Sequence, residues 1–196
     1  MSLSRDAQTA QSEFTTLEQL YSALAAENTS LIGIDGWPGA GKSTLADRLS
    51  ERLGVRVVHL DSLLDMNRGA FTPNIRYSEL ERELKHRPLI VEGVCLLEVL
   101  SRAAAEPDVL IYVKKFDAHG VWVDEEDCEL IEPLDPALER VRSVAGLFAK
   151  FDAAIEARSL SSDEEPSLPL TEECLTYHAK YRPTVRATCF YRVVHE

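Results

Sequence analysis

The chain has 196 residues, of which 45% are hydrophobic, and it carries a formal net charge of −12 at pH 7. This length fits one α/β domain with its own core, and the acidic balance argues against a general nucleic-acid-binding protein, because phosphate backbones are bound through basic surfaces. The four cysteines form no C-x-x-C pair, and neither a membrane-spanning run nor a signal-peptide core is visible, so we expect a reduced, cytoplasmic protein that does not act at a membrane.

The first predicted elements are a helix and a buried strand that precede a glycine-rich segment. Residues 13–27 repeat apolar side chains at spacings of three and four, which is typical of an amphipathic helix. The short apolar run 31–34 predicts a strand, and residues 43–53 again show helical spacing. The glycine-rich segment is therefore expected to connect a strand to a helix.

The segment from Gly36 to Thr44 reads Gly-Trp-Pro-Gly-Ala-Gly-Lys-Ser-Thr and contains the complete G-x-x-x-x-G-K-[ST] pattern. In such a loop, successive backbone N–H groups point at phosphate oxygens, while Lys42 supplies an ammonium group and Ser43 a hydroxyl for Mg²⁺. An ordinary glycine-rich turn is the alternative, but the flanking strand and helix favour a nucleoside triphosphate site. The residues expected to bind the nucleotide are Gly36, Gly39, Ala40, Gly41, Lys42, Ser43 and Thr44.

Later apolar runs predict further strands, separated by segments with helical spacing. The strands are expected at 55–60, 89–92, 109–113 and 189–194, and the helices at 78–85 and 94–105. This alternation is typical of a parallel sheet that is covered by helices on both faces. We expect a single domain over residues 1–196, with residues 1–28 as an N-terminal helix extension.

Two acidic residues stand at the ends of predicted strands, Asp61 after the second and Glu92 at the end of the third. Ligands of open parallel sheets sit beyond the carboxyl ends of the strands. We therefore expect Asp61 to take the proton from a hydroxyl substrate and Glu92 to lie on the metal side. A helix cap or a surface acid is the plainer interpretation of each. For His59 we favour packing or capping over catalysis, and for Asp35 hydrogen bonding within the loop.

The segment 114–170 is expected to form an insertion with a lid-like role. Its acidic run, 124–127, favours a solvated loop or hairpin. A long amphipathic helix is expected over 136–158, followed by a flexible connection at 159–169.

Phosphoryl transfer also needs positive charge around the transferring group. The candidates on the long helix are Arg140, Arg142 and Arg158, of which we select Arg142 as the catalytic candidate. Solvated helix arginines explain the same pattern equally well. A relatively basic region formed by Arg68, Arg76, Arg82 and residues 85–87 could meet an anionic acceptor.

The motifs in the first hundred residues resemble those of the uridine kinase and phosphoribulokinase group of P-loop kinases. The resemblance is carried by residues 32–44, by His-Leu-Asp-Ser at 59–62 and by Val-Glu-Gly-Val at 91–94, in the group's order and spacing. It implies a three-layer α/β/α P-loop NTPase fold with a five-stranded parallel sheet. It also implies ATP and Mg²⁺ as cofactors, transfer of the γ-phosphoryl group to a hydroxyl of a small molecule, and Asp61 as the base that activates this acceptor.

The sequence departs from that group in two places. Uridine kinases carry an aromatic pair after the base, where this chain has Leu63 and Leu64, so uridine is not the expected substrate. The arginine-rich lid sequence that follows the fourth strand of the group is replaced by Lys-Lys-Phe-Asp at 114–117 and by the acidic run.

The expected function is that of a kinase that phosphorylates a nucleoside, a sugar or a vitamin-like alcohol. Two other protein classes are alternatives to it. A GTPase should carry an [NT]-K-x-D motif, and the nearest string, 114–117, lacks its first residue. The second alternative is an ATP-binding P-loop protein or ATPase with a regulatory role and no acceptor. The presence of Lys42, Ser43 and both strand-end acids favours the kinase. The sequence is compatible with a monomer and with a homo-oligomer.

Overall fold

A parallel sheet of six strands forms the centre of the computed structural model, which describes residues 11–26, 29–65, 70–130, 132–156 and 168–194, with the backbone alone for 148–156. The strand order is β1-β6-β5-β2-β4-β3, and every neighbouring pair is parallel. The strands are β1 (Ser12–Phe14), β2 (Leu31–Gly36), β3 (Arg56–His59), β4 (Leu89–Glu92), β5 (Val109–Phe116) and β6 (Cys189–Val194).

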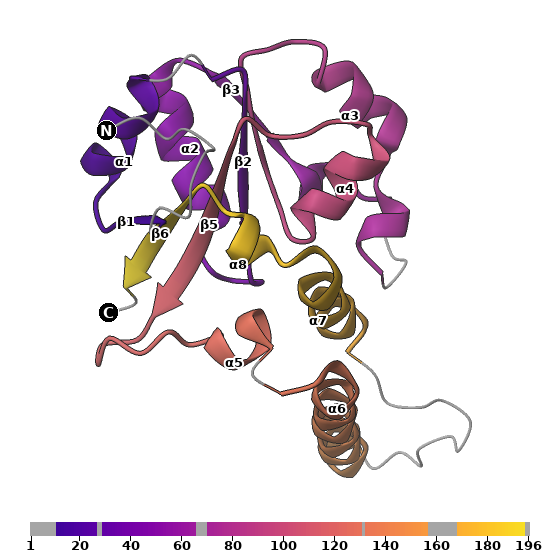
Figure 1. The fold of residues 1–196 in the computed structure, drawn as a ribbon. Helices are drawn as coiled ribbons and strands as arrows, with labels where there is room; N and C mark the ends of the chain where they lie inside the picture. Colours follow the sequence, from indigo (N-terminus) through magenta and orange to yellow (C-terminus); the bar gives the residue numbers. More distant parts are fainter. Residues whose placement is uncertain (1–10, 27–28, 66–69, 131, 157–167, 195–196) are drawn as a thin grey trace.

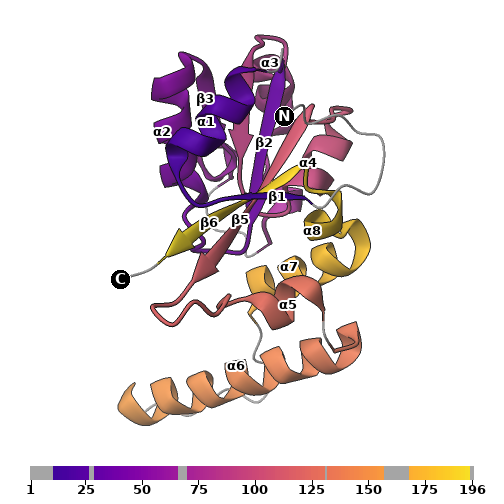
Figure 2. The ribbon, with the colours of Figure 1, turned by 60° about the vertical axis from the view of Figure 1, so that its left-hand side comes forward.

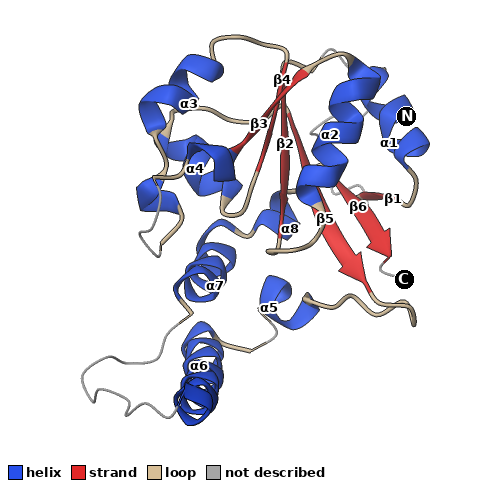
Figure 3. Cartoon of the chain, turned by 180° about the vertical axis from the view of Figure 1, so that it is seen from behind, coloured by secondary structure: helices blue, strands red, loops and turns tan. Residues whose placement is uncertain are grey.

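Helices cover both faces of this sheet (Figure 1; Figure 3). One face packs against α1 (Leu17–Ala25) and α2 (Lys42–Leu53), and the other against α3 (Tyr77–Glu83), α4 (Leu96–Arg102) and α7 (Pro169–Tyr181). The remaining elements are the 3₁₀ helices η1 (Leu60–Leu63) and η2 (Thr72–Asn74) and the helices α5 (Glu125–Glu129), α6 (Leu134–Glu156) and α8 (Pro183–Arg186). The expected three-layer α/β/α P-loop NTPase fold is confirmed.

The sheet has six strands rather than the expected five, because β1 adds to its edge beside β6. The Gln11 side-chain amide donates to the carbonyls of Thr184, Val185 and Ala187 over 2.7–3.1 Å. These bonds connect the start of β1 to the backbone that precedes β6. A three-residue strand without an apolar run gives no recognisable period in the sequence. The expected helix at 13–27 accordingly starts later, at α1.

The segment after β5 also differs from expectation. β5 is longer than the predicted run and ends at Phe116, which pairs with Trp122 in an isolated antiparallel bridge. The acidic run was expected to be a solvated loop or hairpin, but residues 125–129 form α5. Acidic side chains in the first turn favour a helix N-terminus, and the buried Cys128 anchors the helix to the core.

Figure 2 shows α5 and α6 below the sheet, on the side to which β5 and β6 point. The long α6 packs against α7, where Ala137 and Val141 contact Leu175. Arg158 and residues 159–167 of the expected flexible connection lie outside the described residues. In the described ranges, no helix is long and apolar enough to cross a bilayer.

A buried polar cluster holds α7 against the sheet. The ring of His178 is 2.7 Å from the Cys174 carbonyl through Nδ1 and 2.7 Å from the Tyr112 hydroxyl through Nε2. That hydroxyl also lies 3.1 Å from the sulfur of Cys128, and the Trp37 ring stands 5.4 Å from the imidazole, centroid to centroid. Burial lowers the pKa of His178 to about 4, so the imidazole of the folded protein is neutral.

We predict that this histidine makes the protein less stable in mild acid. The unfolded chain takes up a proton near pH 6.5 and the folded chain only near pH 4, so the contribution of His178 is complete above pH 6.5 and is lost as the pH falls through this window. Between pH 7.5 and 5.0 the wild type should lose about 2 kcal/mol more unfolding free energy than His178→Gln, as measured by urea denaturation. Equal losses in the two proteins would contradict this assignment.

Candidate active site

The glycine-rich loop connects β2 to α2, as its sequence predicts. Gly39 and Gly41 adopt positive φ angles of 75° and 94°, and a Cβ atom on Gly36 would lie 2.8 Å from the carbonyl oxygen of Val113. Gly41 is the N-cap of α2 and supplies no side-chain acceptor, so the first-turn N–H groups are left for another partner. A helix start of this kind binds anions.

Lys42 is buried, with 7% of its surface exposed, and its ammonium group donates to the Trp37 carbonyl over 2.8 Å. Burial lowers the pKa of this ammonium, while the carboxylates of Asp35 and Glu92 act in the opposite direction. The lysine is therefore held against the loop, close to two carboxylates.

Asp35, the residue before the loop, is fully buried. Its carboxylate accepts hydrogen bonds from the Gly36 N–H over 2.7 Å and from the hydroxyl of Tyr177 on α7. Burial raises the pKa of Asp35 to about 6, against the effects of these hydrogen bonds and of the Lys42 charge. The structure thus shows the local contact expected from the sequence and adds a bond to a distant helix.

Glu92 ends β4 and joins Ser43 to His59. One carboxylate oxygen of Glu92 accepts from the Ser43 hydroxyl over 3.1 Å and lies 2.8 Å from Nδ1 of His59. The other ring nitrogen, Nε2, is 3.1 Å from a carboxylate oxygen of Asp47 on α2. Sequence reasoning assigned His59 a packing or capping role, because no spacing pattern shows that both of its nitrogens meet carboxylates.

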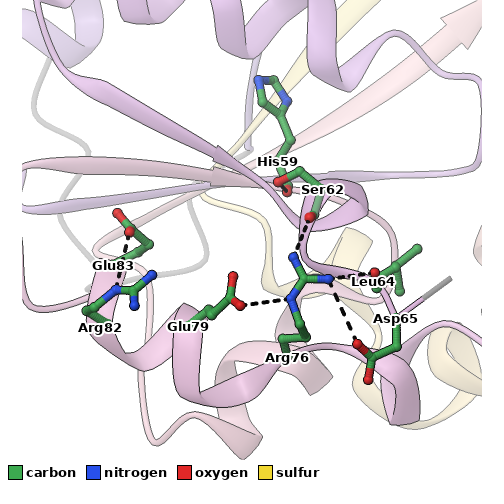
Figure 4. A network of polar contacts seen from close by, with 8 residues as sticks. All are labelled: His59, Ser62, Leu64, Asp65, Arg76, Glu79, Arg82 and Glu83. Carbon is green, nitrogen blue, oxygen red and sulfur yellow. Dashed lines mark hydrogen bonds and ion pairs between the residues drawn. The ribbon is translucent and has the colours of Figure 1, made fainter.

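Asp61 lies in η1, directly after β3, with its side chain exposed. The following backbone is held by Arg76, whose guanidinium donates to the carbonyls of Ser62 over 2.9 Å and Leu64 over 2.7 Å (Figure 4). The same guanidinium is 3.0 Å from the Glu79 carboxylate. Arg76, which the sequence offered as a partner for an anionic acceptor, therefore fixes the loop that carries Asp61.

The loop and both strand-end acids line one cavity of about 630 Å³. Its polar lining includes Lys42, Ser43, Thr44, Asp61 and Glu92. The rest of the lining is formed by Pro38, Gly39, Gly41, Leu64, Phe71, Gly93, Val94 and Leu170. Two residues of the expected nucleotide site, Gly36 and Ala40, belong to the loop without lining the cavity, and Ala40 packs into the core.

The lid candidates on α6 contact acidic residues. Arg142 donates to the carboxylate of Glu172 on α7 over 2.9 Å, and Arg140 is 2.7 Å from Asp127 and 2.8 Å from Glu132. Neither arginine lines the cavity in the described structure. The arrangement brings Lys42, Ser43 and the strand-end acids together and leaves these arginines outside.

No known protein family and no curated protein matches the sequence. Among solved structures, a possible uridine kinase from Bacillus stearothermophilus is similar over 89% of this chain and 96% of its own, with 16% identity and a TM-score of 0.47. A protein provisionally assigned as a fructose transport system kinase from Silicibacter sp. TM1040 is similar over 91% and 99%, with 17% identity and a TM-score of 0.40.

Shikimate kinase from Acinetobacter baumannii, in complex with shikimate, is similar over 88% of this chain and 87% of its own, with 18% identity and a TM-score of 0.38. Similarities at this level transfer no substrate, and the fold assignment rests on the strand order and the glycine-rich loop. The solved structures to which this chain is similar include uridine kinase-like and sugar kinase-like P-loop kinases, and the substrate of this chain stays unassigned.

Proposed function

We propose that this protein is an ATP-dependent phosphotransferase that moves the γ-phosphoryl group of ATP to a hydroxyl of a small molecule. The observation that supports this proposal is that Lys42 and Ser43 share one cavity with Asp61 and Glu92. Phosphoryl transfer requires phosphate binding, charge neutralisation and a group that accepts the hydroxyl proton. Each requirement has a candidate residue in this cavity.

The donor end is formed by the loop and the start of α2. Backbone N–H groups there would bind the ATP phosphates, and Lys42 would move from the Trp37 carbonyl to a phosphate oxygen. Ser43 and Glu92 fit Mg²⁺, because their hydroxyl and carboxylate oxygens lie 3.1 Å apart at the cavity. Mg²⁺ in such sites is held mainly by phosphates and water, with one or two protein ligands. When bound, Mg²⁺ would neutralise charge on the transferring group.

Asp61 is the proposed proton acceptor at the other end of the cavity. Its exposed carboxylate can reach the hydroxyl of a bound substrate, and the Arg76 contacts fix the backbone after it. The remaining volume holds a small molecule beside the phosphates. The acidic net charge of the chain fits such a substrate better than a nucleic acid.

We further propose Arg142 as a lid arginine within the lid-like region 114–170. In its ion pair with Glu172, 55% of the arginine side chain is accessible but only 17% of the glutamate side chain. The guanidinium would have to exchange Glu172 for a phosphate oxygen, and the higher charge of the ATP phosphates would favour this exchange. This role requires α6, or the side chain of Arg142 alone, to approach the cavity once ATP is bound.

Turnover of ATP should depend on an added alcohol and on both ends of the cavity. Lys42→Ala should lower the rate of transfer by about 100-fold or more, because it removes the positive charge that stabilises the transferring phosphoryl group. Asp61→Asn should lower kcat by about 100-fold or more while ATP binding stays intact, because only the proton acceptor is lost. ADP release with panels of nucleosides, sugars and vitamin alcohols measures transfer, and isothermal titration measures ATP binding.

The matched controls for these variants are Lys85→Ala and Glu81→Gln, which change exposed residues outside the cavity lining. Both should retain wild-type turnover. ATP hydrolysis that is equally fast without any alcohol would favour an ATPase or regulatory protein and would contradict the proposed transfer.

His59 should orient Glu92 toward the magnesium site. We expect His59→Gln to raise the Mg²⁺ concentration for half-maximal turnover by about 10-fold, since partners that orient a metal-side ligand have effects of this size. In the presence of ATP, the Mg²⁺ concentration that gives half of the increase in melting temperature should rise by a similar factor. The exposed His86→Gln is the control, and an unchanged Mg²⁺ dependence in His59→Gln would contradict the orienting role.

A further inference from the structure

Apart from the phosphate loop, four apolar side chains line the cavity. Leu64 follows η1, Phe71 precedes η2, Val94 follows β4, and Leu170 lies on α7, so four separate parts of the chain supply this apolar wall. Leu64 and Leu170 are partly exposed, whereas Phe71 and Val94 are buried. The wall therefore has accessible apolar surface that a bound molecule can cover.

The wall is held in place by backbone hydrogen bonds. Glu173 on α7 accepts the N–H groups of Phe71 and Thr72 over 2.5 Å and 2.8 Å. Leu64 pairs with Ile75 in an antiparallel bridge, which joins the two sides of the loop that follows Asp61. A wall that is held by such bonds favours a ligand of matching shape and polarity, because less of its order has to be gained on binding.

The positive charges near the wall can be assigned only among the described residues, and Arg68, which lies between Leu64 and Phe71 in the sequence, is outside them. Of the described residues that line the cavity, Lys42 alone is cationic, and it belongs to the donor end. Arg76 uses its donors on the carbonyls of Ser62 and Leu64 and on the Glu79 carboxylate (Figure 4). An anionic acceptor would meet the carboxylates of Asp61 and Glu92, and Lys42, which the ATP phosphates would occupy, would not offset the loss of its hydration.

We propose that the acceptor is an uncharged alcohol with an apolar portion, an inference that rests on the phosphotransferase function proposed above. The apolar portion covers Leu64, Phe71 and Leu170, and the hydroxyl points to Asp61. In the transfer, a bond forms between the hydroxyl oxygen and the γ-phosphorus while the bond from this phosphorus to the β,γ-bridging oxygen breaks. The hydroxyl proton goes to Asp61, and ADP leaves with the electron pair of the broken bond.

Matched alcohols that differ in charge or in chain length test this inference. Pantothenol is compared with pantothenate and methyl shikimate with shikimate, and a second series runs from 1,2-propanediol to 1,2-hexanediol. Phosphorylated product is quantified by mass spectrometry, and kcat/KM is obtained for each alcohol. We expect kcat/KM to be about 10-fold or more higher for the uncharged member of a pair, and to rise several-fold along the diol series.

A variant of the wall gives a second, independent measurement. Leu64→Lys should reverse or abolish the preference for uncharged alcohols, because it places a cation where the wall is apolar. Leu147→Lys changes an exposed leucine on α6, 56% accessible, and should leave the preference unchanged. The purified variants are compared with the wild type by near-UV circular dichroism, and Leu64→Ala replaces Leu64→Lys if the lysine variant does not fold. Leu64→Ala should flatten the diol series.

The outcomes separate this inference from the function on which it rests. Product formed only or preferentially from the charged alcohols overturns the inference and leaves the phosphotransferase standing, as does a flat diol series or an unaltered preference in the Leu64 variant. ATP hydrolysis without phosphorylation of any alcohol overturns the phosphotransferase, and the acceptor class falls with it.

Discussion

The buried carboxylate of Asp35 is the interaction on which the geometry of the candidate active site depends. It is fully buried between β2 and the loop, and it accepts hydrogen bonds from the Gly36 N–H and the Tyr177 hydroxyl. Burial raises the pKa of Asp35 to about 6, so an ionised group is stable here only while these donors and Lys42 stay near it. The loop, the lysine and α7 are therefore constrained together.

The bond to Tyr177 also reaches the acceptor side, because α7 carries residues of both halves of the site. Glu173, one turn before Tyr177, accepts the N–H groups of Phe71 and Thr72, and Leu170 lines the cavity directly. A displacement of α7 would disturb the buried carboxylate and the apolar wall at once. This shared helix therefore connects the glycine-rich loop to the apolar wall, although the two come from distant parts of the chain.

The parts of the site that could be predicted from the sequence are those with a local signal. The glycine-rich loop is a contiguous motif, and Asp61 and Glu92 lie at strand ends that apolar runs reveal. The contacts between Asp35 and Tyr177 and between His59 and Glu92 span 142 and 33 residues, and no local period encodes such pairs. The edge strand β1 was not predicted, because three residues are too few to show an alternation of apolar and polar side chains. Its place depends on β6, which forms only when the fold does.

The distribution of charge is compatible with the proposed phosphate site in an acidic chain. The arginines of α6 contact carboxylates, as Arg142 contacts Glu172 and Arg140 contacts Asp127. The fixed positive elements are Lys42 and the start of α2, which act at close range, where the distant net charge is screened. In the proposed function, these elements bind the phosphates. The cavity lining also includes apolar side chains and one exposed carboxylate, Asp61, a combination that would favour a hydroxyl on a carbon framework over a second anion.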